Sequence, residues 1–254
     1  MKKISALISA LILITCVGFL ALQNKSNQDI NTKKESSVSV SKTEQKGISI
    51  SDKPINADEI KEENVLFFFN STATFDTGQI RVTIDEINES HLVDTIVKGI
   101  ITDIDYVYLS GETEKTIYTV NVLESYKGNS AKEIKVYEDG GYIRVKDILD
   151  EFKDKGIDLE KKLTKEQLEN GLVDKKFCNA PHPKKGQQVI LYLGKNTHPA
   201  YLADSYTPLG SVYGKFTLDK NKEQYKRPPY DGIVNFEDSI SEVDMEKKLK
   251  NKFK

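Results

Sequence analysis

Short runs of apolar, aromatic and β-branched residues recur from residue 65 onward and restrict the fold more than any other feature. They cover residues 65–75, 79–87, 91–109, 115–128, 133–141 and 187–194, and two or three shorter runs lie within 200–219. Most alternate between apolar and polar residues, which predicts strands with one face buried. The run 187–194 is almost continuously apolar and predicts a strand buried on both faces. We therefore expect a mainly β chain.

Turn and glycine positions indicate how these strands are connected. Asp-Thr-Gly at 76–78 is a turn signal between the first two runs, which predicts a hairpin that includes a strand over 79–87. Gly99, inside the third run, predicts a bend or bulge. Seven or so short strands with glycines at the corners favour a small antiparallel OB-like barrel over residues 64–237, because closure removes exposed sheet edges.

A helical insertion is expected within the barrel, at about residues 143–171. Apolar residues spaced i, i+3, i+4 and i+7 from Val145 to Phe152 predict one helix, which Gly156 ends. A possible capping box, Thr164 to Gln167, begins a second helical stretch.

A C-terminal helix is expected over residues 238–254, with Ser239 to Glu242 as its capping box. Its last turns carry Lys247, Lys248, Lys250, Lys252 and Lys254. Lysines at this end complement the helix dipole. Contact with anionic lipid is the alternative interpretation.

An apolar segment without charges, Ile4 to Leu22, follows the basic start Met1-Lys2-Lys3. This order is typical of a secretory signal, and the run approaches the roughly 20 residues of a spanning helix. Because Phe19 stands where a small residue is wanted before a cleavage site, residues 1–22 are either a signal peptide or a retained membrane anchor. The lysines favour export of the remainder, so we expect a location at the outer face of the cell membrane or secretion.

Cys16 is a candidate lipidation residue, because Leu-Ile-Thr-Cys at 13–16 is similar to the lipobox of bacterial lipoproteins. Thr15 and the apolar continuation to Leu22 depart from that pattern and favour a cysteine used as a small apolar residue. The other cysteine is Cys178, so no disulfide can form within the globular part.

Residues 23–63 are polar, mixed in charge and rich in Ser, Lys, Asn and Glu. Such a segment buries too little apolar area to offset the entropy of ordering. We expect a disordered linker of roughly 40 residues between the membrane and the barrel.

The charge balance and the absence of known motifs exclude several function classes. Lys and Arg number 37 and Asp and Glu 39, whereas nucleic-acid binding needs a basic excess or stripe. The sequence contains no P-loop, G-x-S-x-G, H-E-x-x-H, EF-hand or dinucleotide fingerprint. We therefore assign no catalytic residue, cofactor or metal ligand and expect a protein that is not an enzyme.

Cys178 and His182, four residues apart, are the strongest candidates for chemistry. Four-coordinate zinc would need two further ligands, for which only His91 and His198 remain among the histidines. A cysteine nucleophile would need a base and an orienting group. The favoured interpretation is a loop thiol beside a turn histidine.

Carboxylates on the predicted strands could supply acid–base pairs: Asp103, Asp105, Glu124, Glu138 and Asp139. Paired carboxylates act only at a fixed separation. Charges that alternate along strands favour a solvated face, which is the preferred interpretation. Asp139-Gly140-Gly141 is expected to be a tight turn.

Several short motifs follow one another in a recognisable order. They are V-x-G at 97–99, Y-T-V-x-V at 118–122, K-G at 127–128, I-x-V at 134–136, G-G at 140–141, G-x-x-x-I-L-Y-L at 186–193 and G-K-F at 214–216. The pattern, over about half the chain, resembles uncharacterised exported proteins of Gram-positive bacteria and OB-like barrels of the netrin-module and metalloproteinase-inhibitor kind. Inhibitory netrin modules use cysteines near their N-terminus, which this domain lacks, so no site residue is transferred.

These observations favour a non-catalytic binding or interaction module of the cell envelope, tethered to the membrane through its N-terminal segment. Its partner would be an unknown protein or a cell-wall ligand. The alternative is an extracellular hydrolase built around Cys178 and His182 or around a carboxylate pair.

Overall fold

The computed structural model confirms a mainly β chain with a C-terminal helix. It describes residues 53–71, 83–108, 114–197, 201–228 and 236–253. The expected leader, Cys16 and most of the expected linker lie outside the described residues, as does the 76–78 turn. No helix in the described ranges is long and apolar enough to cross a membrane.

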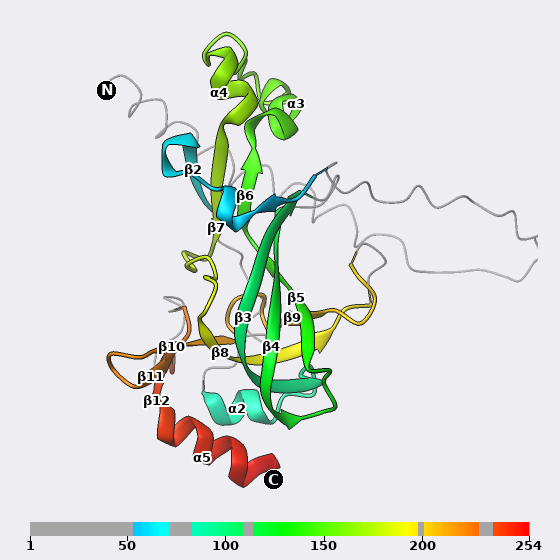
Figure 1. The fold of residues 1–254 in the computed structure, drawn as a ribbon, viewed down its shortest axis with the longest axis vertical. Coiled ribbons are helices and arrows are strands. Elements are labelled where there is room, and N and C mark those ends of the chain that lie inside the picture. Colours follow the sequence, from blue (N-terminus) through cyan, green and yellow to red (C-terminus); the bar gives the residue numbers. More distant parts are fainter. Residues whose placement is uncertain (1–52, 72–82, 109–113, 198–200, 229–235, 254) are drawn as a thin grey trace, which may run out of the picture. The chain divides into compact units, whose positions relative to one another are not determined.

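The larger sheet has nine strands in the order β1-β3-β4-β5-β9-β8-β10-β11-β12 (Figure 1). Their bounds are β1 Ile55–Asn56, β3 Thr95–Tyr108, β4 Glu114–Lys127, β5 Glu133–Asp139, β8 Gln188–Lys195, β9 Tyr206–Pro208, β10 Lys215–Asp219, β11 Gln224–Lys226 and β12 Ser239–Ser241. The long strands β3 and β4 pair antiparallel, and β3 also pairs antiparallel with β8. The strands predicted over 91–109, 115–128, 133–141 and 187–194 are confirmed.

Successive side chains of β8 point to opposite faces of the sheet, so alternate residues belong to two different apolar clusters. Val189, Leu191 and Leu193 belong to a first cluster, with residues of β3, β4 and β5, and all three are fully buried. Ile190 and Tyr192 belong to a second cluster and are also fully buried. The strand is therefore buried on both faces, as its continuous apolar run predicts.

Gly99 fulfils its predicted role at a bulge. The register of β3 against β4 shifts between Lys98 and Gly99. A Cβ at this position would lie 2.4 Å from Val120 Cγ1 and 2.7 Å from the Asn121 carbonyl oxygen. Only glycine allows the two strands to approach this closely.

The strand predicted over 79–87 is wrong where it is described, whereas residues 79–82 and the 76–78 turn of the expected hairpin lie outside the described residues. Residues Ile84–Asn88 form helix α2 instead, and Thr83 is its N-cap. The Thr83 hydroxyl accepts from the Glu86 N–H while the Glu86 carboxylate accepts from the Thr83 N–H, a complete capping box. The capping box, together with the burial of Ile84 and Ile87 three residues apart, favours a helix over the strand that the short apolar–polar alternation predicts.

A second sheet has three strands in the order β2-β7-β6: β2 Val65–Ser71, β7 Leu172–Phe177 and β6 Gly141–Arg144. β2 pairs parallel with β7, and β6 pairs antiparallel with it. β7 was not predicted, because its sequence Leu-Val-Asp-Lys-Lys-Phe carries three charges and no clear alternation.

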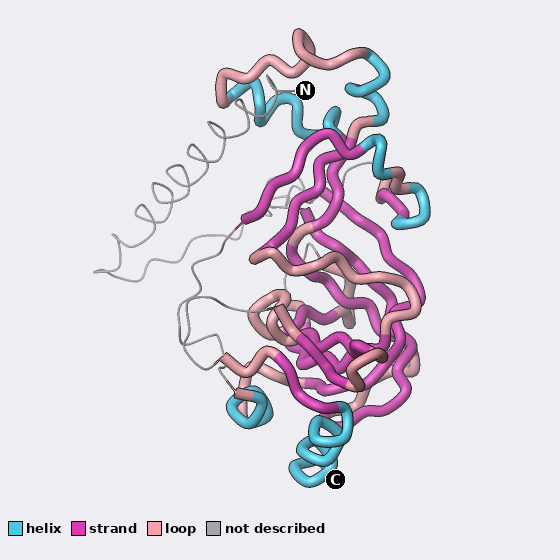
Figure 2. The backbone as a smooth tube through the Cα atoms, turned by 90° about the vertical axis from the view of Figure 1, so that its left-hand side faces the viewer, coloured by secondary structure: helices cyan, strands magenta, loops and turns pink. Residues whose placement is uncertain are grey.

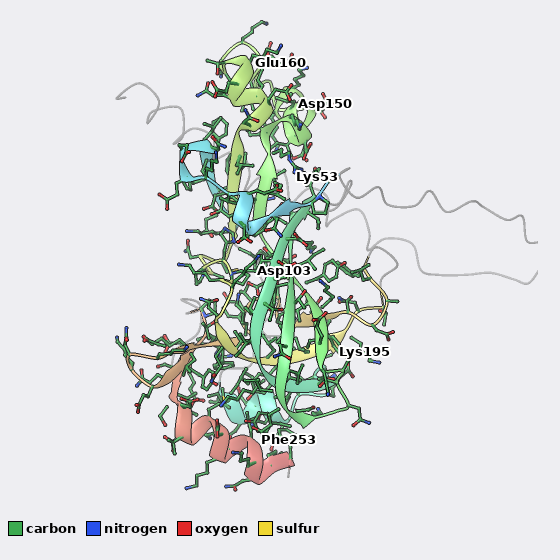
Figure 3. All side chains as sticks on the ribbon, viewed as in Figure 1. Lys53, Asp103, Asp150, Glu160, Lys195 and Phe253 are labelled. Atoms are coloured by element: carbon green, nitrogen blue, oxygen red, sulfur yellow. The ribbon has the colours of Figure 1, made fainter. Side chains whose placement is uncertain are left out.

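The helical insertion occupies residues 145–170, close to the predicted 143–171, and lies between β6 and β7. It contains the 3-10 helix η3 Val145–Ile148, α3 Leu149–Asp154 and α4 Lys165–Asn170. Asp150 and Glu160 mark this segment in Figure 3. The Thr164–Gln167 capping box forms in both directions, and Gly156 adopts a φ of 74° after α3.

The C-terminal helix α5 spans Glu242–Phe253, so its predicted start was too early. Ser241, not Ser239, accepts from the N–H of Asp244, because residues 239–241 pair with β11 as β12. Met245 and Leu249 of α5 are fully buried in the second cluster together with Ile84 and Ile87 of α2. Figures 1 and 2 show α2 and α5 at the same end of the strands.

The expected linker boundary at residue 63 is also too late. Ile55 is buried in the first cluster and pairs with Tyr106 of β3. The 3-10 helices η1 Ala57–Glu59 and η2 Glu62–Asn64 follow before β2. Ordered structure therefore begins by residue 53, within the segment that composition alone assigned to the linker.

Candidate functional site

Charged and aromatic side chains gather where the three-stranded sheet contacts β3, β4 and β5. We call this group the buried polar cluster: Tyr106, Glu114, Thr116, Tyr118, Glu138, Tyr142, Asp174, Lys175, His182 and Lys215. Glu114, Thr116, Glu138, Asp174 and Lys215 each expose 4% of their surface or less. A charge this deeply buried needs a partner, so each contact in the cluster matters for stability.

Glu138 lies at an inward position of β5, in line with the buried Ile134 and Val136 of the same face. Its Oε1 accepts from the Lys215 Nζ at 2.5 Å, and its Oε2 accepts from the Tyr118 hydroxyl at 3.2 Å. Burial raises the pKa of Glu138, although the charge of Lys215 acts against this. The prediction of a solvated face is therefore wrong for this carboxylate.

Two further contacts tie the three-stranded sheet to β4. The Lys175 Nζ donates to the Glu114 carboxylate at 2.6 Å. The Thr116 hydroxyl donates to the Gly140 carbonyl at 2.7 Å. Gly140 has the predicted positive φ, at 91°, but it is a single residue that links β5 directly to β6 and not a tight turn.

His182 and Asp174 form a pair in the same region. The His182 Nε2 lies 2.7 Å from the Asp174 Oδ1, and both side chains are largely buried. The His182 ring packs against Tyr142 at 4.9 Å and against Tyr106 at 5.9 Å between ring centroids. Burial raises the pKa of both tyrosines.

Cys178 and His182 do not form the candidate pair. Cys178 packs in a separate apolar group with Ala180, Val212 and Tyr213, while His182 bonds Asp174. In the part of the chain that is described, no three His, Cys, Asp or Glu side chains are placed to hold a metal ion.

The remaining candidate carboxylates each have a local partner. Asp139 pairs with Lys115, Asp103 lies 3.0 Å from the Lys185 Nζ, and Asp105 accepts from the Asn56 amide at 3.1 Å. Glu124 accepts from the Tyr126 hydroxyl at 2.8 Å. Figure 3 shows Asp103 midway along β3. The structure does not bring these carboxylates together into an acid–base pair.

Strand β2 is the second feature of functional interest. It is an edge of the three-stranded sheet, and among the described residues it pairs only with β7. Phe67 and Phe69 stack near Phe152 of α3, whereas Phe68 points away and is 68% exposed. The three consecutive phenylalanines could have indicated this exposed position from the sequence, because successive side chains of a strand point to opposite faces.

Comparisons with protein-family models, with curated proteins and with solved structures find no match. The site is therefore interpreted from its own geometry.

Proposed function

We propose that this chain is an exported cell-envelope protein, tethered at the membrane by residues 1–22, whose β domain is a non-catalytic binding module. The observation that carries the proposal is strand β2, which pairs on one side only within the described part of the chain and has the exposed Phe68 at its centre. Its partner is then an extended protein segment that adds a strand to β2 and places an apolar side chain beside Phe68.

The edge suits such a partner for two physical reasons. An edge strand presents unpaired N–H and C=O groups, which natural proteins usually cover or flank with charge. The sequence of β2, Val-Leu-Phe-Phe-Phe-Asn-Ser, contains no charged residue. Strand addition obtains affinity from main-chain hydrogen bonds and specificity from alternate side chains. The packing of Phe67 and Phe69 against Phe152 would hold the edge rigid for this purpose.

The test is site-specific photo-crosslinking on the full-length chain in membranes. Phe68→p-benzoylphenylalanine should yield a protein adduct that maps to an extended apolar segment. The matched control is the same replacement at Val243, which is 75% exposed on α5. The purified partner should then bind a Phe68→Asp variant at least about tenfold more weakly, while Val243→Asp leaves binding unchanged. The same adduct from both positions, or none at 68, would refute a role for this edge.

A hydrolase is the second candidate, because the Asp174–His182 contact supplies an oriented base of the kind that activates nucleophiles. Since Cys178 packs in a separate apolar group, we expect its thiol to react at an ordinary rate. The test is alkylation of Cys178 at pH 6, followed on its own peptide. A rate far above that of a free thiol, which His182→Ala abolishes, would support an activated cysteine. The rate of an ordinary thiol would exclude this nucleophile.

We also propose that the larger sheet closes into a small OB-like barrel. Support comes from the pairings β3–β4, β4–β5, β5–β9, β9–β8 and β8–β3, which lead from β3 back to β3. The weakest link is β5–β9, a parallel pairing at Val136 and Tyr206 alone. In a closed barrel, amides of β9 should exchange hydrogen more slowly than those of β12, which pairs only with β11 in the described part of the chain.

A further inference from the structure

The contact between Lys215 and Glu138 differs from every other ion pair described in this chain. Both side chains are only 3% exposed, and the amine lies 2.5 Å from a carboxyl oxygen. The contact joins β10 to β5 across 77 residues of sequence. Two ions removed from water in this way gain little from their mutual attraction, since desolvation opposes it.

We propose that Lys215 and Glu138 form an intramolecular isopeptide bond. The Lys215 Nζ, as a neutral amine, attacks the side-chain carboxyl carbon of the protonated Glu138. An N–C bond forms, one C–O bond breaks, and the lost hydroxyl leaves with a proton from nitrogen as one molecule of water. No oxidant, reductant or cofactor takes part, and the product is a secondary amide between β10 and β5.

Proximity is the first condition that the geometry meets. The short Nζ–Oε1 contact holds the amine beside the carboxyl carbon, with both groups on strands of one sheet. Groups held in such an orientation react with effective molarities on the order of 10⁵–10⁸ M. Condensation is unfavourable between separate molecules in dilute aqueous solution, and this proximity, with both side chains only 3% exposed, favours it.

Protonation is the second condition. An ammonium and a carboxylate do not condense, whereas the neutral amine and the neutral acid do. Burial raises the pKa of Glu138 and so favours its protonated form. Transfer of one proton from Lys215 to Glu138 converts the ion pair into the reactive neutral pair without any charge entering from solvent. A low-dielectric site favours that transfer, because it removes two buried charges together.

Tyr118 supplies the third condition, polarisation of the carboxyl group. Its hydroxyl donates to the second oxygen of Glu138 at 3.2 Å, and its side chain is fully buried. A donor fixed on that oxygen stabilises the negative charge that develops there as nitrogen attacks. Tyr118 is therefore a positioning and polarising residue for the condensation.

The chain contains a matched control next to this pair. Lys115 contacts Asp139, the neighbour of Glu138, through a similarly short ion pair. Their side chains are 13% and 26% exposed, so water reaches both groups. We expect this second pair to remain ionic.

The test is peptide mapping of the purified full-length chain. Trypsin normally cleaves after Lys135, Arg144, Lys195, Lys215 and Lys220. An isopeptide bond blocks cleavage after Lys215, so segment 196–220 should appear covalently joined to segment 136–144, lighter by one water than their sum. Fragmentation should place the link on Glu138. Free segments 136–144 and 196–215 in full yield from the folded chain would overturn the proposal.

Three variants complete the experiment. Lys215→Arg keeps the charge but cannot form this amide, so the two free segments should return. Tyr118→Phe should lower the linked fraction at a fixed time after folding at least about tenfold, because a polarising donor is lost. Lys115→Arg should leave the linked fraction unchanged. If the linked fraction is the same in Tyr118→Phe and in the wild type, Tyr118 has no role in the condensation. If the cross-link persists in Lys215→Arg, it is formed by another lysine and the proposal is overturned.

Discussion

The two ends of the β domain are stabilised in opposite ways. Around α2 and α5 the interior is mostly apolar: Ile84, Ile87, Met245 and Leu249 are buried together, and the buried Arg227 lies over the ring of Phe216 in the same cluster. Lys248 pairs there with Asp85 at the surface, where the two side chains are 36% and 68% exposed. In the buried polar cluster the charges lie inside, and Glu138 and Lys215 are almost fully covered. The same types of ion pair therefore have very different consequences for stability at the two ends.

The difference comes from solvent. At the α5 end, water screens each charge, and loss of one partner leaves the other hydrated. In the buried polar cluster, loss of one partner leaves an unpaired charge in the interior. We therefore expect the effects of substitutions to follow burial and not the number of ion pairs, and four measurements test this.

The largest effect is expected for Lys215→Met. It removes the cross-link across 77 residues, worth about 4–5 kcal/mol of chain entropy, and leaves the buried Glu138 carboxyl without its cationic partner, at a further ~3–5 kcal/mol. Denaturant unfolding measures the sum. In the double variant Lys215→Met/Glu138→Leu, only the stability lost through the buried carboxyl should be recovered, and the loss from the missing cross-link should remain. Complete recovery would show that the contact is an ion pair without a covalent bond.

Leu249→Ala should follow, with a loss of about 3 kcal/mol. Leu249 is fully buried against α2, so its truncation leaves a cavity in the apolar end. Thermal and denaturant unfolding measure the loss, and Val243→Ala on the exposed face of α5 is the control. Equal effects at both positions would mean that α5 is not docked as described.

A smaller, pH-dependent effect is expected at Glu246. Hydrogen bonds from Lys98 and then Lys250 lower the pKa of Glu246 in the folded chain. The folded state therefore binds a proton less readily than the unfolded state, and the contribution is present above the unfolded pKa and lost as pH falls through the folded value. Unfolding curves between pH 6 and 3 should show this acid-side decline in wild type and a shallower one in Glu246→Gln.

The smallest effect is expected for Lys248→Ala, at within about 1 kcal/mol. The pair with Asp85 is bidentate but exposed, at 2.7 and 2.8 Å. The small loss should shrink further when salt is raised. A loss as large as that of Leu249→Ala would contradict the division between the two ends.

The periodicity of apolar residues correctly predicted the strands with long apolar runs. It failed where local contacts, such as a helix cap, favoured a different structure. The continuous apolar run of β8 and the bulge at Gly99 were predicted and confirmed. Residues 79–87 alternate as a strand would, yet Thr83 and Glu86 cap a helix there. The charges of β7 masked its strand pattern, since the partner of Lys175 is Glu114, 61 residues away in the sequence.

The candidate site was less predictable for the same reason. Glu138 was a candidate from the sequence, but nothing local distinguishes it from its neighbour Asp139, and only the inward face of β5 makes it buried. Lys215 lies 77 residues away, and the G-K-F motif that contains it gives no indication of a partner. His182 was considered from the sequence only as an alternative pair with Cys178, and its partner in the structure is Asp174, eight residues earlier.

The parallel pairing of β2 with β7 sets the order in which the chain can mature. The hydrogen bond from the Ser71 hydroxyl to the Lys176 carbonyl joins residues 105 positions apart. At a synthesis rate of about 5–20 residues per second, β2 exists for roughly 5–20 s before its partner strand has been made. During that interval its three phenylalanines have no sheet to join. Whatever shields this segment from other nascent chains must act early, and a delay in producing β7 should increase aggregation without altering the finished fold.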